Sequence, residues 1–139
     1  MTESPQRPDS DQRPDGDVVQ MSVPADVAYV STLRLTAAGL AARCDLTIDE
    51  IEDLRLAVDE ACSLLLPHAD QGSALHAEFV LARGRLEVSA RVSSAGGGEL
   101  DRDGFAWTVL GALASSVDVA TADGSVVITL TKRREAASA

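Results

Sequence analysis

A helical pattern over residues 47–66 constrains this chain more than any other part of its sequence. Its apolar residues recur at three- and four-residue spacing, which places them on one face of an amphipathic helix. Thr47 is a suitable N-cap, and Glu50 completes a capping box, in which each side chain satisfies a backbone N–H group of the other residue. Pro67 ends the pattern, because proline lacks an N–H group. The sequence therefore predicts a well-capped core helix that stops near Pro67.

An acidic pair, Asp59 and Glu60, lies in the middle of this helix. Glu60 points away from the apolar face, but Leu56 and Leu64 lie one turn to either side of it, so the back of the helix is mixed in character. Two interpretations follow. Both carboxylates are solvated charges, as most charged residues are, or Glu60 lies at the rim of a cleft. Periodicity alone favours the solvated interpretation.

Composition limits the class of protein. The chain has 139 residues, a formal net charge of -10, 45% hydrophobic residues and only 3% aromatic residues, so Leu, Val and Ala must build its core. The negative charge argues against direct binding to nucleic acid or to an anionic membrane, because both require a basic surface. No run approaches the roughly 20 apolar residues of a membrane span, and the N-terminus lacks a signal-peptide core. We expect a cytoplasmic protein.

The chain divides into one domain and two tails. Residues 1–16 are rich in Pro, Asp, Arg, Gln and Ser, a composition typical of disorder. Residues 17–133 form the expected folded domain, and residues 134–139 form a polar C-terminal tail. Cys44 and Cys62 lack metal-ligand spacing, and no zinc pattern is present, so we expect two buried reduced thiols and no metal site.

Alternating apolar and polar residues predict one edge strand and two hairpins, with strands over residues 17–23, 75–82, 85–93, 117–121 and 125–132. The second hairpin turns at Asp123 and Gly124, a strong two-residue turn signal. Two further helical patterns cover residues 26–44 and 104–116. Helices and hairpins are segregated along the chain. The expected fold is therefore an α+β two-layer sandwich, a mostly antiparallel sheet with about three helices on one face.

Two other features remain open on the residues alone. The glycine run from Gly96 to Gly98 could let backbone N–H groups approach a phosphate, although a flexible loop is the favoured interpretation. It matches neither the P-loop nor the dinucleotide-binding fingerprint. The short basic cluster of residues 132–134 is expected to be solvated.

Three segments, in this order, resemble a known family. Residues 54–62 resemble the conserved-helix motif of the RsbW-type anti-sigma factors, which are serine kinases of the GHKL (histidine-kinase-like) ATPase superfamily. Residues 104–114, followed by residues 117–119, resemble the second glycine box of that family and its following strand. Residues 125–132 resemble its last strand. The resemblance covers residues 17–133 in the same order.

This resemblance implies a Bergerat-type α/β sandwich that binds Mg-ATP between its helices and its sheet. Such proteins hold an alternative sigma factor away from RNA polymerase. An anti-anti-sigma protein, a small STAS domain, binds them and releases the sigma factor, and the kinase can phosphorylate a serine on that antagonist. Dimerisation is common in the family. The implied partners are thus a sigma factor, a STAS antagonist and a second copy of the chain.

The family's functional residues are only partly present. Glu60 falls on the acidic residue that serves as general base of phosphoryl transfer. Gly104 matches the second glycine box, Ala106 replaces its next glycine, and Gly96 lies in the loop that would contact phosphate. The magnesium-binding Asn of the family is Leu64 here, and a leucine cannot ligate a hard cation that needs oxygen ligands.

The adenine-binding Asp of the family is also missing, because residues 92–96 read Val-Ser-Ser-Ala-Gly. Phosphoryl transfer depends mainly on positioning and on metal neutralisation of developing charge. These departures favour an anti-sigma factor that acts by sequestration, with weak or no ATP binding, over an active serine/threonine kinase. A small α+β regulatory module that binds a metabolite, with Glu60 merely solvated, is the third hypothesis.

Overall fold

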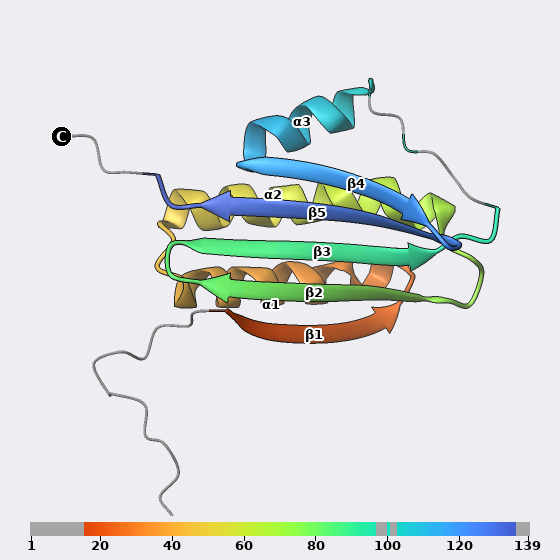
Figure 1. Cartoon of the computed structure of the whole chain (residues 1–139), viewed down its shortest axis with the longest axis horizontal. Coiled ribbons are helices and arrows are strands. Elements are labelled where there is room, and N and C mark those ends of the chain that lie inside the picture. The colour runs from red at the N-terminus through yellow and green to blue at the C-terminus, as the bar shows by residue number, and fades with distance from the viewer. Residues whose placement is uncertain (1–15, 97–99, 101–102, 136–139) are drawn as a thin grey trace, which may run out of the picture.

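One antiparallel sheet forms the first layer of the molecule, and helices cover a single face of it (Figure 1). The structure is a computed structural model that describes residues 16–96, 100 and 103–135. The strand order is β1-β2-β3-β5-β4. The strands are β1 (Asp17–Pro24), β2 (Ala74–Ala82), β3 (Arg85–Ser93), β4 (Ser116–Ala122) and β5 (Ser125–Arg133). β1 lies at one edge of the sheet, as the sequence predicts.

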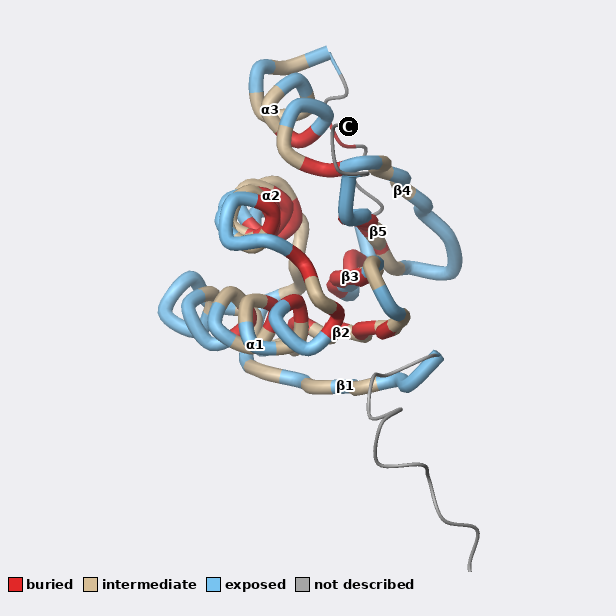
Figure 2. Tube along the Cα trace, turned by 90° about the vertical axis from the view of Figure 1, so that its left-hand side faces the viewer, coloured by how far each residue is buried: buried red, intermediate tan, exposed pale blue. Residues whose placement is uncertain are grey.

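The second layer contains α1 (Val30–Arg43), α2 (Ile48–Leu65) and α3 (Phe105–Leu113), with short 3-10 turns at Val27–Tyr29 and Leu66–His68. Figure 2 shows α1 and α2 against one face of the sheet and α3 beside α2 near the β4 edge. Pro67, in the second 3-10 turn, lies two residues after the last residue of α2, so the helix stops near Pro67 as the sequence predicts. The α+β two-layer sandwich is confirmed.

The capping box of α2 is present. The side-chain oxygen of Thr47 accepts a hydrogen bond from the Glu50 N–H at 3.2 Å, and the Glu50 carboxylate accepts one from the Thr47 N–H at 2.8 Å. The same carboxylate also accepts the N–H of Glu135, at 2.8 Å. Glu50 therefore anchors both the start of α2 and the chain beyond β5.

The core lies between the helices and the sheet, where alternate strand residues point inward. The largest fully buried side chains include Leu33 and Leu54 from the helices and Phe79, Ile128 and Leu130 from the strands. The opposite face of the sheet carries mainly polar and small side chains and has no helix over it (Figure 2). An antiparallel sheet tolerates one solvated face of this kind.

The turn between β4 and β5 follows its sequence signal. Asp123 and Gly124 have φ angles of 52° and 74°. Positive φ at both central residues defines a type I′ turn, whose twist matches that of the two strands it joins. The pairing of Ala122 with Ser125 then fixes the register of the β4–β5 hairpin.

Lys132 differs from expectation. Only 7% of this residue is exposed, so the cluster of residues 132–134 is not solvated as a whole. Its Nζ donates to the Leu113 carbonyl at 2.7 Å and to Asp53 Oδ2 at 3.2 Å. The sequence interpretation was wrong because alternation along β5 points this lysine into the helix layer, where it meets partners distant in sequence.

Other expectations have mixed outcomes. Cys44 and Cys62 are buried and free, as predicted. No helix among the described residues is long and apolar enough to cross a membrane. Most of the predicted tails, residues 1–16 and 134–139, lie outside the described residues, so the domain boundaries stay a prediction.

Candidate functional site

The helix α2 has two different flanks beside its buried face. Asp53 lies on the flank toward α3, because it pairs with Lys132, which also holds the Leu113 carbonyl of α3. Glu60 follows Asp53 by seven residues, close to two helical turns, and so lies on the same flank. Asp59 lies on the other flank, because it pairs with Arg34 of α1. The two acidic neighbours therefore face different elements.

Glu60 is half-buried, and its side chain has no hydrogen bond or ion pair within the described part of the chain. Leu64, one turn further along the same flank, is half-buried and packs against the hydrophobic core. The position next to the predicted general base is therefore occupied by an apolar side chain that belongs to the core. A lone carboxylate beside a leucine is a poor ligand set for Mg²⁺.

The helix α3 packs along this flank. Leu110 is fully buried, while Trp107 and Leu113 are partly buried against the core. The contact between α2 and α3 is thus largely apolar, and the Lys132 ammonium holds its far end. This packing places α3 beside α2, the helix that carries Glu60 and Leu64 (Figure 1).

The N-terminus of α3 carries two of the predicted phosphate contacts. Gly104 is its N-cap and lacks a side-chain cap, and Ala106 is a half-buried residue of its first turn. Phe105, between them, is 83% exposed. Free backbone N–H groups at a helix start favour anions, so the local chemistry of this end remains compatible with the predicted role.

The loop after β3 is held by a residue that sequence reasoning missed. Asp70 accepts the Ala95 N–H on both carboxylate oxygens, at 2.9 and 3.1 Å. The Ser94 residue is buried, and its N–H donates to the Gly124 carbonyl at 2.7 Å. The backbone donor nearest Gly96 is therefore already satisfied, and by a negative charge that would repel a phosphate. No local sequence signal could have revealed Asp70, because 25 residues separate it from Ala95.

The predicted residues are only partly assembled. Glu60 shares the α2–α3 region with Gly104 and Ala106, whereas Gly96 is exposed in the loop beyond β3. Within the described residues no hydrogen bond links Gly96 to Glu60. Gly97 and Gly98 lie outside the described residues. No group of three or more potential metal-binding side chains occurs in the described part of the chain. The ligating side chains in the described residues do not fit a Mg-nucleotide.

A separate hollow of about 730 Å³ lies between α1 and α2. Arg34 and Asp59 form its polar part: one guanidinium nitrogen of Arg34 donates to Asp59 Oδ1 at 2.9 Å and Oδ2 at 3.0 Å. The Arg34 Nε is buried and has no partner among the described residues. Val27, Leu66 and Pro67 add apolar surface at its rim. The hollow thus combines a partly exposed ion pair with apolar surroundings.

The thiol of Cys62 is not suited to act as a nucleophile or a metal ligand, because both roles require the thiolate. Burial, with a smaller contribution from Asp59, raises its pKa to about 12. Burial likewise raises the pKa of Cys44. Both thiols therefore stay protonated near neutral pH and act as core residues.

The fold is a two-layer α+β sandwich in which α2, the helix of Glu60, packs against α3, a short helix with Gly104 as its N-cap. This arrangement defines the class as a histidine-kinase-like ATPase fold. Residues 23–132 match the family model described as the histidine kinase-like ATPase domain. The chain belongs to this family.

Curated relatives are serine-protein kinases named RsbW. The protein from Bacillus subtilis is 44% identical over 75 residues, which are 52% of this chain and 47% of the relative. The protein from Halalkalibacterium halodurans is 37% identical over 90 residues, which are 64% of this chain and 54% of the relative. The chain therefore matches about half the length of these relatives.

A solved structure shares the fold. The RsbU and RsbW domains of a Mycobacterium tuberculosis protein match with a TM-score of 0.63 and 18% sequence identity, covering 84% of this chain and 32% of that chain. At this identity the similarity concerns the fold alone.

Proposed function

We propose that this chain is an anti-sigma factor that binds and sequesters an alternative sigma factor without needing ATP. The observation that carries the proposal is Leu64, a core-packed leucine beside Glu60 in a chain whose relatives are RsbW proteins. The scaffold of the family is retained, while the position that would bind magnesium is apolar. Binding to a protein partner can survive this loss, because it requires a surface and not a metal.

Two further contacts support the absence of nucleotide chemistry. Asp70 occupies the Ala95 N–H in the loop where the family binds its nucleotide. The apolar packing of Leu110 and the Lys132 contact hold α3 against α2 through the chain's own residues. Phosphoryl transfer needs a positioned metal and a positioned phosphate, and these residues supply neither.

We place the sigma-factor surface on the α1–α2 hollow. The Arg34–Asp59 pair is partly exposed and can exchange partners with charged side chains of another protein. Val27 and Leu66 offer apolar contact around this centre. Such a combination is typical of interfaces, in which arginine and apolar anchors dominate the binding energy. The chain's charge of -10 would steer it toward basic partners.

The regulatory scheme follows from the same surface. An anti-anti-sigma STAS protein would compete with the sigma factor for the chain and release it. Two copies of the chain would form the dimer that binds the sigma factor. The protein would work in the cytoplasm, where sigma factors meet RNA polymerase. Both partners bind in the absence of nucleotide under this proposal.

The test is size-exclusion chromatography of the purified chain with each alternative sigma factor of its host. One of them should co-elute with the wild-type protein. Arg34→Ala should weaken that complex at least about tenfold, as loss of an interface arginine commonly does. Arg43→Ala, on the exposed end of the same helix, is the matched control and should bind normally. If no sigma factor co-elutes, the proposal is lost.

A second candidate function is an active serine kinase acting on the STAS antagonist. Glu60 favours it, because this carboxylate has no partner within the described residues and lies on the flank that faces α3. Radiolabelled ATP incubated with the chain and candidate antagonists distinguishes the two functions. Phosphate transfer that disappears in Glu60→Gln would establish the kinase and refute the ATP-independent proposal.

A further inference from the structure

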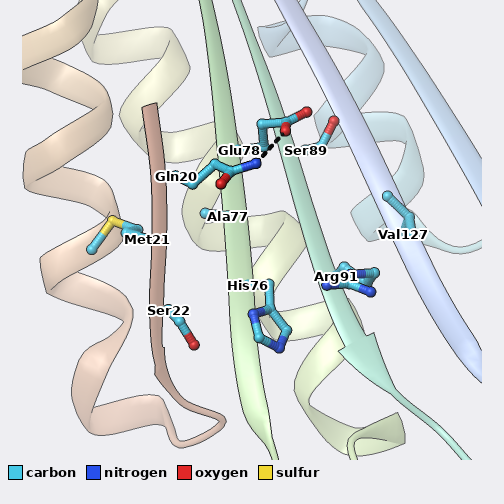
Figure 3. Close-up of a pocket in the computed structure, with 9 residues that line it drawn as sticks. All are labelled: Gln20, Met21, Ser22, His76, Ala77, Glu78, Ser89, Arg91 and Val127. Atoms are coloured by element: carbon cyan, nitrogen blue, oxygen red, sulfur yellow. Dashed lines mark hydrogen bonds between the residues drawn. The ribbon is translucent and has the colours of Figure 1, made fainter. Parts of the chain in front are cut away.

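The open face of the sheet contains a hollow away from the helices and from both regions described above. Its volume is about 630 Å³, and Figure 3 shows the side chains that line it. We name it the sheet-face hollow, with its polar lining formed by Gln20, Ser22, His76, Glu78, Ser89 and Arg91. None of these side chains belongs to the hydrophobic core.

Strand pairing arranges these side chains in two rows. Ser22 pairs with His76 across β1 and β2, and His76 pairs with Arg91 across β2 and β3. These three residues therefore form one row. Directly paired side chains on one face are about 5 Å apart at Cβ, so the imidazole and the guanidinium are immediate neighbours. The first row is consequently rich in hydrogen-bond donors.

The second row is satisfied internally. The Gln20 side-chain N–H donates to Glu78 Oε2 at 2.9 Å. The Ser89 hydroxyl shares a hydrogen bond with the Thr129 hydroxyl at 3.0 Å. This row, which Figure 3 shows beside the first, therefore has most of its hydrogen-bonding groups already engaged.

The first row is different. The side chains of Ser22, His76 and Arg91 have no hydrogen bond or ion pair within the described part of the chain. Arg91 is not bridged to Glu78, although the two lie diagonally across neighbouring strands. The Arg91 guanidinium, the His76 imidazole and the Ser22 hydroxyl thus lie side by side along the hollow, and none of the three accepts a hydrogen bond from another within the described residues.

We propose that the sheet-face hollow binds a carboxylate group, held by Arg91 and His76 with the Ser22 hydroxyl beside them. A guanidinium matches the planar carboxylate with two parallel N–H donors. The neighbouring imidazole donates from a ring N–H, and the hydroxyl completes the set. A group that carries a single negative charge fits this surface best, because the lining contains one arginine, Arg91, and one carboxylate, Glu78, and the whole chain is acidic.

The carboxylate can come from a small dicarboxylic metabolite or from an acidic side chain of a protein. The chemistry is shared, and the probes below separate the two sources. Inorganic phosphate should bind less well, because it places more than one negative charge on a single group beside Glu78, whereas each carboxylate of succinate or of the peptide carries only one. The proposal does not depend on the anti-sigma function.

The experiment is a ¹H–¹⁵N NMR titration of the full chain at fixed ionic strength. The probes are sodium succinate, inorganic phosphate and a capped peptide of alternating Glu and Ser. Succinate or the peptide should give saturable shifts confined to β1, β2 and β3 around His76 and Arg91. Saturation by succinate identifies a small-molecule source, and saturation by the peptide alone identifies a protein source.

Two variants make the test specific. Arg91→Gln should weaken binding at least about tenfold, because the charge-assisted contacts are lost. Arg85→Gln removes the same charge from the far end of the same strand and face, and should change affinity less than about twofold. Both side chains are exposed, so the spectra should report intact folds. Shifts that never saturate, equal losses in both variants, or tighter binding of phosphate than of either carboxylate probe would overturn the proposal.

Discussion

Replacing Lys132 with methionine should loosen the C-terminal end of α3 from α2. The Lys132 side chain is 9% exposed, and its Nζ is the polar link between these two helices and β5. Methionine keeps most of the aliphatic volume but removes both hydrogen bonds. The Leu113 carbonyl then loses a donor that lies 2.7 Å away.

The expected magnitude follows from three contributions. Loss of the hydrogen bond from a charged donor to the Leu113 carbonyl costs about 1.5–3 kcal/mol. The pair with Asp53 adds about 0.5 kcal/mol, because that carboxylate is 43% exposed and well screened. Removing the buried ammonium recovers part of the lost free energy of unfolding, because burying that charge was itself unfavourable. We expect a net loss of about 1–2 kcal/mol in the free energy of unfolding.

Urea unfolding measures this loss, and hydrogen exchange locates it. Amides of α3 should exchange faster in Lys132→Met, while amides of α1 should change little. Arg133→Met is the matched control, because the neighbouring side chain is exposed and its replacement should cost less than about 0.5 kcal/mol. If the Lys132 variant is as stable as the wild type and α3 exchanges at an unchanged rate, desolvation outweighs the link and the reasoning fails.

Three further predictions concern Glu50, Leu64 and Cys62. Burial alone would raise the pKa of Glu50, but the N–H donors of Thr47 and Glu135 hold it below the usual value of about 4.3. Glu50→Gln should therefore lower the free energy of unfolding by about 1–2 kcal/mol at neutral pH. Urea titrations should show this difference shrinking as the pH falls through the pKa of Glu50 in the folded state. Leu64→Asn should lower stability by about 1–2 kcal/mol in the same assay without creating Mg-ATP binding by calorimetry, because the adenine-binding Asp is also missing; strong nucleotide binding would contradict this. Cys62 should resist iodoacetamide at pH 8 until the protein unfolds, as mass spectrometry can check, and rapid labelling of the folded chain would be the opposite result.

Local features of the fold could be predicted because their causes are local. The Thr47–Glu50 capping box spans three residues, and the turn at Asp123 and Gly124 joins adjacent strands. The strand β3 has the bounds that alternation predicts. Hydrophobic period, caps and turn residues act over a few positions, so a single sequence contains them in full.

Long-range polar contacts could not be predicted. Asp53 and Lys132 are separated by 79 residues, and the backbone N–H that Glu50 accepts from Glu135 is 85 residues away. Asp70 reaches Ala95 only because β2 and β3 return the chain to the end of α2. Such pairings depend on how the elements are arranged in space. The sequence therefore indicated which roles Glu60 and Leu64 could take, but it did not predict the contacts made by the other residues on that side of α2.

The same reasoning applies to the acidic pair of α2. On the sequence Asp59 and Glu60 form a single feature that is either solvated or functional. In the structure Asp59 faces α1 and binds Arg34, whereas Glu60 lies on the flank toward α3. One helix thus presents an ion pair with α1 on one side and, on the other, a carboxylate that has a leucine one turn away.

The most direct test of the central claim is calorimetric titration of the sigma factor that co-elutes with this chain, performed with and without saturating Mg-ATP. The account predicts the same dissociation constant, within about twofold, in both conditions. A complex that forms only with Mg-ATP, or that binds at least about tenfold more tightly with it, would contradict nucleotide-independent sequestration.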